Sequence, residues 1–312
     1  MANYNHAHYI GEALEAILSQ DFKPLEVIVV DDGSTDDSVE VINEVMKREP
    51  VVRLLRNDRN SGPAFSHTRG MKYASGDYVF LAAADDKVLP GFFEKSMELL
   101  ARHPEVGLCC SDPGSFDGST GIVNENRRSL NSNSPYFSPA EITARLRQGG
   151  FDIAGHTCLI RRSAILEVGG LIPELRWHCD WFALQVVAFR YGLCYIPECL
   201  SLIRIHPGSY SSIGRKGNQQ TVVLRSLLRF LRSREYRDVF PLFVESKVAE
   251  GFGPPLLKAL VADPMNWIGS TRVLLWPMLC NETRRRREEL SRSAPPLVKA
   301  VYRRLLKRQR RR

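Results

Sequence analysis

Hydrophobic residues in the first part of the chain alternate between helical and strand-like spacing. Ile10, Leu14 and Ile17 recur at the spacing of one helix face. Residues 25–30, after Pro24, form a short apolar run that is typical of a buried strand. The pattern repeats, with helices expected near 39–46, 64–73 and 91–102, and strands at 51–55, 78–83 and 106–110. This alternation predicts an α/β fold in which helices flank a mostly parallel sheet.

The composition changes after residue 112. Residues 113–139 are rich in Ser, Asn, Gly and Pro, which predicts a long surface loop on the acceptor side. Beyond the loop we expect strands at 156–160, 194–196 and 200–205 and a helix at about 180–190. Residues 213–280 are expected to form a mainly helical extension, and residues 281–312 a basic tail.

The start of the chain departs from this scheme. Met1 comes directly before the first expected helix, with no strand-like run ahead of it, although a sheet of alternating strands and helices needs a strand there. We therefore expect that the first strand is missing or truncated, or that the true start lies upstream of Met1.

Composition and charge narrow the class of protein. The 312 residues are 44% hydrophobic and 25% charged, which excludes a collagen-like, disordered or disulfide-scaffold protein. The seven cysteines form no Cys-x-x-Cys pair, which favours a reduced, cytoplasmic compartment. No secretion signal opens the chain, and no apolar run approaches the length of a membrane span.

The net charge of +8 comes from the basic tail at residues 281–312. Residues 281–312 hold 13 Lys and Arg against 3 Asp and Glu, whereas residues 1–280 hold 30 against 32. Apolar and basic positions interleave after Pro296, as in a helix that lies on an anionic membrane surface. A solvated charge run and a nucleic-acid contact remain open, although nucleic acid is not the partner we expect.

Two pairs of acidic residues follow expected strands. Asp31 and Asp32 precede Gly33 at the end of one strand, where a carboxylate can accept from a nucleobase, or where the group is only a turn and a helix cap. Asp85 and Asp86 follow the strand at 78–83, and paired carboxylates suit Mg²⁺ or Mn²⁺ on a diphosphate. The alternative for that pair is a solvated helix N-terminus.

Several short motifs in order resemble the family 2 glycosyltransferases of the GT-A (Rossmann-like) fold. The resemblance covers residues 1–212, with a nucleotide-binding half at 1–112 and an acceptor half at 113–212. The motifs that carry it are Asn3-Tyr4-Asn5, Asp31-Asp32-Gly33-Ser34, Asn60-Ser61-Gly62, Gly76-Asp77-Tyr78, Asp85-Asp86, Ile160-Arg161-Arg162-Ser163, Gly169-Gly170, His178-Cys179-Asp180-Trp181 and Arg204-Ile205-His206-Pro207. The chain departs from the family pattern at Ala83, where many members have Asp, and at Ser66-His67-Thr68.

The resemblance implies a role for each matching position. Asp31 and Asp32, lined by Asn3, Tyr4 and Asn5, would hold the nucleobase, and Asp85 would meet the ribose. Asp86 would hold Mn²⁺ or Mg²⁺ on the diphosphate, with His206 reaching the metal or diphosphate, or serving only as a loop histidine. His67 or Arg69 would contact the base or phosphate. Asp180 would be the catalytic base, although its position without the resemblance favours an N-cap.

The function implied is an inverting, metal-dependent sugar transfer. The donor would be a UDP-sugar and the acceptor a glycan or lipid-linked molecule in cell-surface polysaccharide synthesis. The expected location is cytoplasmic, at the inner face of the plasma membrane if the tail binds lipid. The alternatives are a nucleotidyltransferase, which usually carries a Gly-rich phosphate loop that is not visible here, and a catalytically impaired member that only binds sugar nucleotide.

Overall fold

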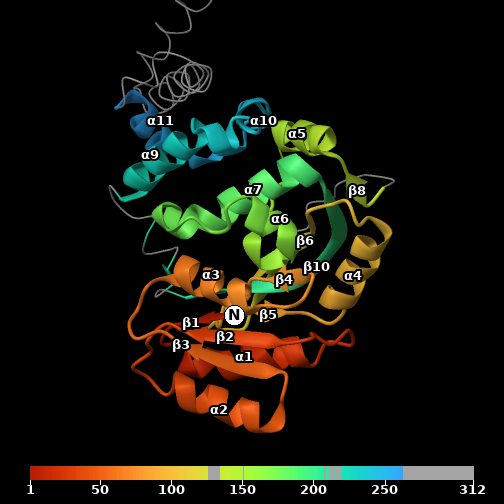
Figure 1. Ribbon diagram of the computed structural model, residues 1–312, viewed down its shortest axis with the longest axis vertical. Coiled ribbons are helices and arrows are strands. Elements are labelled where there is room, and N and C mark those ends of the chain that lie inside the picture. The colour runs from red at the N-terminus through yellow and green to blue at the C-terminus, as the bar shows by residue number, and fades with distance from the viewer. Residues whose placement is uncertain (126–133, 150, 207–208, 211–213, 215–218, 263–312) are drawn as a thin grey trace, which may run out of the picture. The chain divides into compact units, whose positions relative to one another are not determined.

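The computed structural model describes residues 1–125, 134–149, 151–206, 209–210, 214 and 219–262 (Figure 1). The chain divides into a unit of Met1–Val248, which carries every candidate site residue, and a unit of Ala249–Arg312. In the second unit the structure describes α11 (Pro254–Val261). The basic tail at 281–312 and part of the expected helical extension lie outside the described residues.

A parallel sheet of three strands forms one part of the first unit. β1 (Ala2–Asn3), β2 (Val27–Asp31) and β3 (Val52–Arg56) lie in that order, and β2 is buried along its whole length. Helices α1 (Ala7–Leu18) and α2 (Ser38–Arg48) pack together beside it, through a core that includes Ile10, Leu14 and Ile42. A strand therefore does precede the first helix, and it is two residues long.

The second sheet is larger and mixed. Its strands run in the order β4, β9, β6, β10, β5, and only β6 and β10 are parallel. The expectation of parallel strands is thus confirmed for the first sheet and for this one pair. The strands of the path are β4 (Tyr78–Phe80), β9 (Cys158–Arg161), β6 (Leu108–Asp117), β10 (Leu193–Ile205) and β5 (Lys87–Val88). Two further strands, β7 (Val123–Glu125) and β8 (Tyr136–Phe137), pair with β6 and β10.

Two sequence expectations were wrong in this sheet. Residues 113–117 belong to β6 and not to a loop, because β10 offers them partners as far as the pair Ile205 and Asp117. Residues 194–196 and 200–205 are one strand, whose register shifts around Cys199. Pro113 lies next to that irregularity, where a strand tolerates a residue without an N–H group. Tertiary pairing here overrides local propensity.

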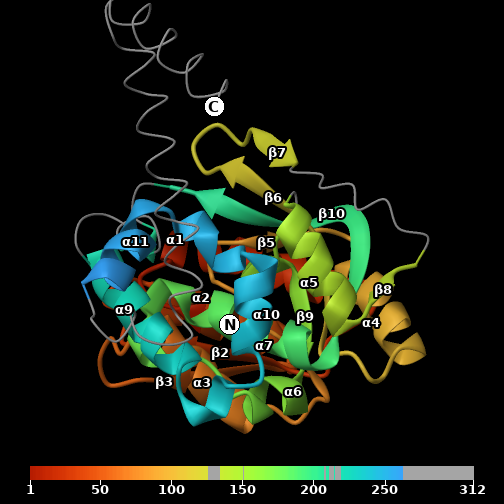
Figure 2. The same cartoon turned by 90° about the horizontal axis from the view of Figure 1, so that it is seen from above.

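Helices cover both sheets. α3 (Pro63–Tyr73) packs on β1 and β2, and α4 (Phe92–Arg102) packs on β6 and β10. In Figure 1, α1 and α2 lie at the lower end of the unit and α5, α9 and α10 at the upper end, and in the view from above in Figure 2, α5 and α10 lie in front. The remaining helices are α5 (Pro139–Gln148), α6 (Arg162–Glu167), α7 (Cys179–Tyr191), α9 (Gln219–Leu231) and α10 (Phe240–Ser246). Side chains on every face of α7 are buried, so this helix belongs to the core of the unit.

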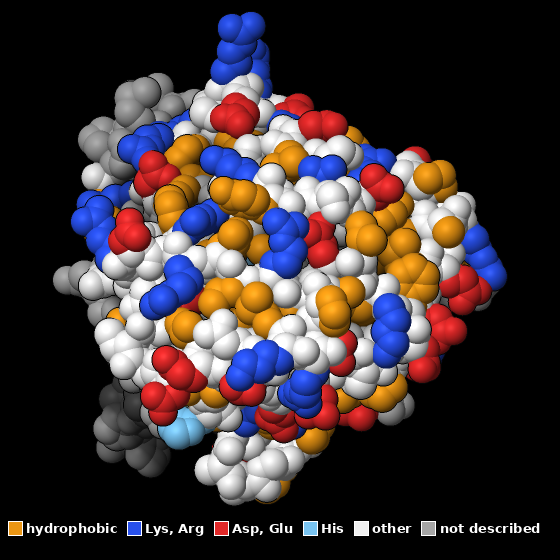
Figure 3. Space-filling model, turned by 60° about the horizontal axis from the view of Figure 1, so that its bottom comes forward, with side chains coloured by type: hydrophobic (Ala, Val, Ile, Leu, Met, Phe, Trp, Pro, Cys, Tyr) orange, Lys and Arg blue, Asp and Glu red, His pale blue; other side chains and the backbone are white. Residues whose placement is uncertain are grey.

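The surface of the described chain carries charges of both signs. On the face shown in Figure 3, Lys and Arg side chains alternate with Asp and Glu, and hydrophobic side chains lie between them. Within the described ranges no helix has the length and hydropathy that a membrane crossing requires.

Candidate active site

Asp31 ends β2 and is fully buried. Its Oδ2 accepts hydrogen bonds from Asn3 Nδ2 at 2.8 Å and Ser34 Oγ at 2.6 Å, and its Oδ1 accepts from Ser34 N at 3.1 Å. Asn5 completes this group, because its N–H donates to Ser34 Oγ and its Oδ1 accepts from Thr35 N. Asp31 therefore ties β1 to the turn that follows β2. Tyr4, between the two asparagines, is 39% exposed.

Asp32 organises the next loop. Its carboxylate accepts from Asn57 Nδ2 at 2.6 Å, Ser61 N at 3.0 Å and Gly62 N at 2.7 Å. Gly33 has a φ of +74°, and a Cβ there would press on the Arg59 backbone, so glycine is required at this turn. Asp31 and Asp32 thus form a turn, which was the alternative that the sequence left open for them. They also hold together two loops at the carboxyl ends of β2 and β3.

Asp85 and Asp86 lie where β10 ends against α1. The Asp85 Oδ2 is 3.0 Å from His206 Nε2, and both side chains are about 15% exposed. Asp86 Oδ1 accepts from Arg204 N at 2.9 Å. Burial, and then the charge of Asp85, raise the pKa of Asp86 from 3.8 to about 7. Two acids are therefore held together here at an electrostatic cost that a bound cation would relieve.

Arg204 and Glu12 support this acidic pair, and sequence reasoning assigned a role to neither. The Arg204 Nε donates to the Asp85 carbonyl oxygen at 2.9 Å, and its guanidinium pairs with Glu12 on α1. The guanidinium also lies between the rings of Tyr9, at 4.4 Å, and Phe116, at 4.3 Å. The available sequence signal was the Arg204-Ile205-His206 motif, but its partner on α1 is 192 residues away in sequence.

The donor atoms in this cluster fit a divalent metal on a diphosphate. Asp85, Asp86 and His206 offer carboxylate oxygens and an imidazole nitrogen, which suit Mn²⁺ or Mg²⁺. In the part of the chain that the structure describes, no group of three or more acidic, His or Cys side chains is arranged to hold an ion alone. Such a site needs oxygens from a substrate, as is usual for Mg²⁺ at phosphates.

His6 lies between the acidic pair and the segment that follows β2. Its N–H donates to Ser38 Oγ at 3.2 Å, and its ring lies 6.0 Å from that of His206. Burial lowers the pKa of His6, while the charge of Asp85 and, more weakly, that of Asp36 raise it. The segment that follows β2 and the acidic pair are therefore neighbours in the structure.

Asp180 lies in the first turn of α7. The N-cap of α7 is His178, so the N-cap interpretation of Asp180 was wrong; its Oδ1 accepts from Trp181 N at 2.8 Å. A Cβ added to Gly155 would collide with the Asp180 carboxylate, so the backbone of residue 155 closes one side of it. That Asp180 faces Asp85 and Asp86 across one site stays a prediction.

The segment before Asp180 is strained and anchored. Arg176 has a φ of +46°, which is rare for a residue with a side chain. Trp177 Nε1 donates to Gln220 Oε1 at 2.7 Å, and His178 Nε2 lies 3.1 Å from the same oxygen. Gln220 on α9 therefore holds in place Trp177 and His178, the two residues that precede α7. It is a positioning residue that lies beyond the motifs and that the sequence did not reveal.

His67 and Arg69 make other contacts on and near α3. His67 lies in the groove beside Met1, and burial, reinforced by the charge of the amino terminus, lowers the pKa of His67 to about 3. Arg69 donates to the Arg56 carbonyl oxygen at 2.6 Å and to Asn57 Oδ1. Arg69 thus braces the loop that Asp32 holds.

Replacing His67 by Gln is expected to make the protein less sensitive to acid. Between pH 6.5 and 3 the unfolded chain binds the His67 proton and the folded chain does not, so the free energy of unfolding falls as the pH falls through this window. From pH 7 to pH 5 we expect the free energy of unfolding of the parent to fall by about 2 kcal/mol more than that of the variant, measured by urea unfolding. The control is exposed His8→Gln, and equal losses in the parent and His67→Gln would contradict the prediction.

Comparison with known proteins agrees with this arrangement. Residues 1–169 match the family described as Glycosyl transferase family 2. A relative from Haemophilus influenzae named an uncharacterized glycosyltransferase is 32% identical over 103 residues, or 33% of this chain and 41% of the relative. The match thus spans less than half of that relative's length.

Two solved structures share the fold. S. aureus TarS 1–349 in complex with UDP-GlcNAc has a TM-score of 0.62 at 18% identity, covering 88% of this chain and 82% of that one. A mannosyltransferase from Pyrobaculum calidifontis in complex with GDP-Man and Mn²⁺ has a TM-score of 0.57 at 18% identity, covering 91% of this chain and 78% of that one. The family match covers more than half of the 312 residues and the sheets follow the fold of these transferases, so the chain belongs to glycosyl transferase family 2 and has the GT-A fold.

Proposed function

We propose that this chain is an inverting glycosyltransferase that moves a sugar from a UDP-sugar to a glycan or lipid-linked acceptor in cell-surface polysaccharide synthesis. The observation that carries the proposal is the acidic pair Asp85 and Asp86 with His206, which lies near the segment that follows β2 in a family 2 chain. TarS binds UDP-GlcNAc in the solved complex, which supports a UDP-sugar donor. Family membership removes the support for a nucleotidyltransferase.

The donor would lie along the carboxyl ends of the strands. The nucleobase would bind beside Asn3, Tyr4 and Asn5, at the group of residues that Asp31 and Asp32 hold together. The ribose would meet Asp85, and Asp86 and His206 would hold the metal on the diphosphate. Arg204, fixed by Glu12, keeps the two acids in place. The metal, when bound, neutralises charge that grows on the leaving diphosphate.

Asp180 supplies the proton acceptor in this proposal. Its carboxylate takes the proton of the acceptor hydroxyl as that oxygen bonds to the anomeric carbon of the sugar. The bond between the anomeric carbon and the diphosphate oxygen breaks, and the electron pair leaves with the diphosphate. Attack from the side opposite the leaving group inverts the anomeric configuration. The anchored turn before α7 would hold the base for this geometry.

A donor screen tests the proposal. We expect UDP-GlcNAc, UDP-glucose or UDP-galactose to raise Tm in the presence of Mn²⁺ and to lose that effect with EDTA, with GDP-mannose as the comparison. Release of UDP in the presence of candidate acceptors then separates transfer from binding alone. If no nucleotide sugar changes Tm with metal present, the proposal is wrong, and binding without turnover would identify an impaired member of the family.

Replacing Gly155 by Ala is expected to lower kcat about 10- to 100-fold. The added Cβ collides with the Asp180 carboxylate and displaces it, and small displacements of a catalytic group have effects of this size. The KM for the donor should change little, because the nucleotide pocket is built from other elements. The matched control is Gly251→Ala, where a Cβ meets no atom within 4 Å. An unchanged kcat in Gly155→Ala would show that the contact between residue 155 and the Asp180 carboxylate does not affect catalysis.

The basic tail supports the location that we propose, the inner face of the plasma membrane. An amphipathic basic segment gains about 1 kcal/mol per basic residue near an anionic surface. We expect the full chain to sediment with phosphatidylglycerol vesicles and a chain ending at residue 280 to stay in solution. Equal sedimentation of the two chains would exclude the tail as the membrane contact.

A further inference from the structure

Three residues at the start of α1 face the end of β10. His6, Tyr9 and Glu12 follow one another at intervals of three, and residues at this spacing are neighbours on the surface of a helix. The first turn of α1 is itself anchored to the segment after β2, because Asp36 Oδ2 accepts from Ala7 N at 2.9 Å. The backbone around Tyr9 therefore holds its side chain at a defined place beside β10.

The ring of Tyr9 contacts both basic side chains at the end of β10. The centre of the ring is 4.4 Å from the guanidinium of Arg204 and 5.7 Å from the centre of the His206 ring. Arg204 and His206 are two positions apart, so in an extended segment their side chains lie on the same face. Ile205, between them, is 55% exposed, as expected for the opposite face. Tyr9 thus packs against the face that carries both side chains.

Arg204 depends on aromatic surfaces as well as on its ion pair with Glu12. Its guanidinium is nearly buried and lies between the rings of Tyr9 and Phe116. A planar guanidinium that has lost its water is stabilised by the faces of aromatic rings. The Nε of Arg204 also donates to the Asp85 carbonyl oxygen at 2.9 Å. A displaced guanidinium would therefore release the backbone of Asp85.

His206 has the same dependence on Tyr9. Its Nε2 is 3.0 Å from Asp85 Oδ2, but this contact alone leaves the imidazole able to turn, because rotation about χ2 of histidine is broad. The ring of Tyr9 lies against the imidazole at an angle of 47°, and the ring of His6 meets it edge-on at 6.0 Å. Groups packed behind a metal ligand set its orientation and its affinity for the ion.

We propose that Tyr9 is a positioning residue for the metal-bound diphosphate of the donor. Its ring holds the His206 imidazole and the Arg204 guanidinium in the orientation that the acidic pair requires. The identity of the ligand rests on the proposed function. All of these contacts are made by the ring and none uses the hydroxyl group, so phenylalanine should replace tyrosine without loss. A side chain without a ring should not.

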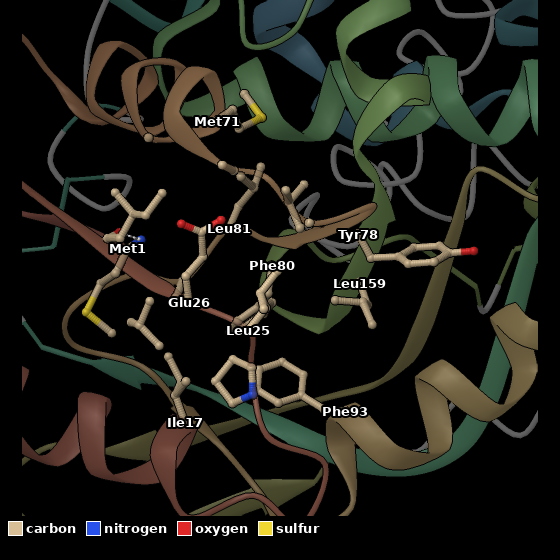
Figure 4. Close-up of a pocket in the computed structure, with 18 of the residues that line it drawn as sticks. Met1, Ile17, Leu25, Glu26, Met71, Tyr78, Phe80, Leu81, Phe93 and Leu159 are labelled. Carbon is tan, nitrogen blue, oxygen red and sulfur yellow. Dashed lines mark hydrogen bonds between the residues drawn. The ribbon is translucent and has the colours of Figure 1, made fainter. Parts of the chain in front are cut away.

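Replacing Tyr9 leaves the other surfaces of α1 in place. Tyr9 is half-buried, whereas Ile10 and Leu14, which pack in the core, are fully buried. α1 reaches the groove of about 420 Å³ beside Met1 through Ile17, which lies at the wall of that groove in Figure 4. Tyr9 is not among the described residues that line the groove. We therefore expect variants of Tyr9 to fold.

The test compares the parent with Tyr9→Phe, Tyr9→Leu and Tyr9→Met, by calorimetry with UDP and Mn²⁺. We expect Tyr9→Phe to bind within about 2-fold of the parent and the other two to bind about 10- to 100-fold more weakly, which is the usual loss when a group behind a metal ligand is removed. Tm without ligand should change by less than about 3 °C. The matched control is Tyr73→Leu, at an exposed tyrosine that ends α3, and it should bind like the parent.

A second measurement follows the His206 ring without any ligand. In protein labelled with ¹⁵N-histidine, at about pH 8, above the range in which histidine usually titrates, the hydrogen bond to Asp85 should favour the Nε2–H tautomer. We expect this tautomer in the parent and in Tyr9→Phe, and a mixture of both tautomers in Tyr9→Leu and Tyr9→Met. The His206 signals are assigned by their loss in His206→Gln. If UDP and Mn²⁺ do not bind the parent, the proposed function is wrong, and the tautomers still test the role of Tyr9.

Parent-like affinity in Tyr9→Leu and Tyr9→Met would overturn the proposal. Equal weakening in Tyr9→Phe and Tyr9→Leu would also overturn it, because the hydroxyl group and not the ring would then matter. Weaker binding with an unchanged His206 tautomer would show that the loss does not pass through His206, and it too would contradict the proposal. If Tyr9→Leu folds poorly, Tyr9→Met decides, because a long flexible side chain fills irregular space without a flat ring.

Discussion

Replacing Asp180 by Asn is expected to lower kcat for sugar transfer by about 10²- to 10⁴-fold, which is the usual contribution of a general base. An amide cannot take the acceptor proton, but its oxygen can still accept from Trp181 N, so the first turn of α7 should persist. Donor binding should be unchanged, because the residues that we propose to hold the nucleotide come from β1, β2 and the loops after them. The measurement is single-turnover UDP release together with donor titration by calorimetry.

The matched control for this prediction is Glu174→Gln. Glu174 is an exposed acid six positions before Asp180, so its replacement removes the same charge from the same region without touching the base. Normal turnover in Asp180→Asn would remove Asp180 from the mechanism. A parallel loss of donor affinity would instead show that the substitution disturbs the fold of the site.

Replacing Asp86 by Asn is expected to weaken Mn²⁺-dependent donor binding by about 100-fold or more, and to leave the protein as stable as before or more stable. The carboxylate would hold the metal on the diphosphate, and an amide is a much poorer ligand for it. Stability should not fall, because burial and the charge of Asp85 already disfavour the ionised acid. The amide oxygen can also keep the hydrogen bond from Arg204 N.

Calorimetry with UDP and Mn²⁺ and a separate thermal melt without ligand measure the two effects. The exposed acid Asp58, changed to Asn, is the control for a general change in charge near the nucleotide pocket. Retention of metal-dependent binding in Asp86→Asn would exclude this carboxylate from the metal site. Weaker donor binding together with equal or higher stability is the expected result for an acid that binds a ligand and does not stabilise the fold.

Much of the fold could be predicted from spacing alone. The runs at 25–30 and 51–55 became β2 and β3, and the helices around them lie as expected, because strongly periodic local patterns survive in the folded chain. Residues 113–117 could not be predicted as strand. Their Ser, Gly and Pro composition indicates a loop, and only pairing with β10, which follows far along the chain, makes them part of β6.

The sequence likewise predicted only some residues of the candidate site. Asp85 and Asp86 were visible as acids after a strand, and the structure adds His206 to Asp85. The contributions of Glu12, Arg204 and Gln220 were not visible, since each acts through a partner from a distant segment. The sequence around an Arg or Gln does not indicate which distant residue its side chain will contact.

The sequence by itself determined the alternating elements of the nucleotide-binding half and the acidic positions at the ends of its strands, because those depend on neighbours a few residues apart. Only the tertiary structure decided which long-range partners complete the site. It brought Glu12 to Arg204, Gln220 to Trp177 and Tyr9 to His206. Those contacts join segments that share no local pattern, and the folded chain alone sets their separation in space.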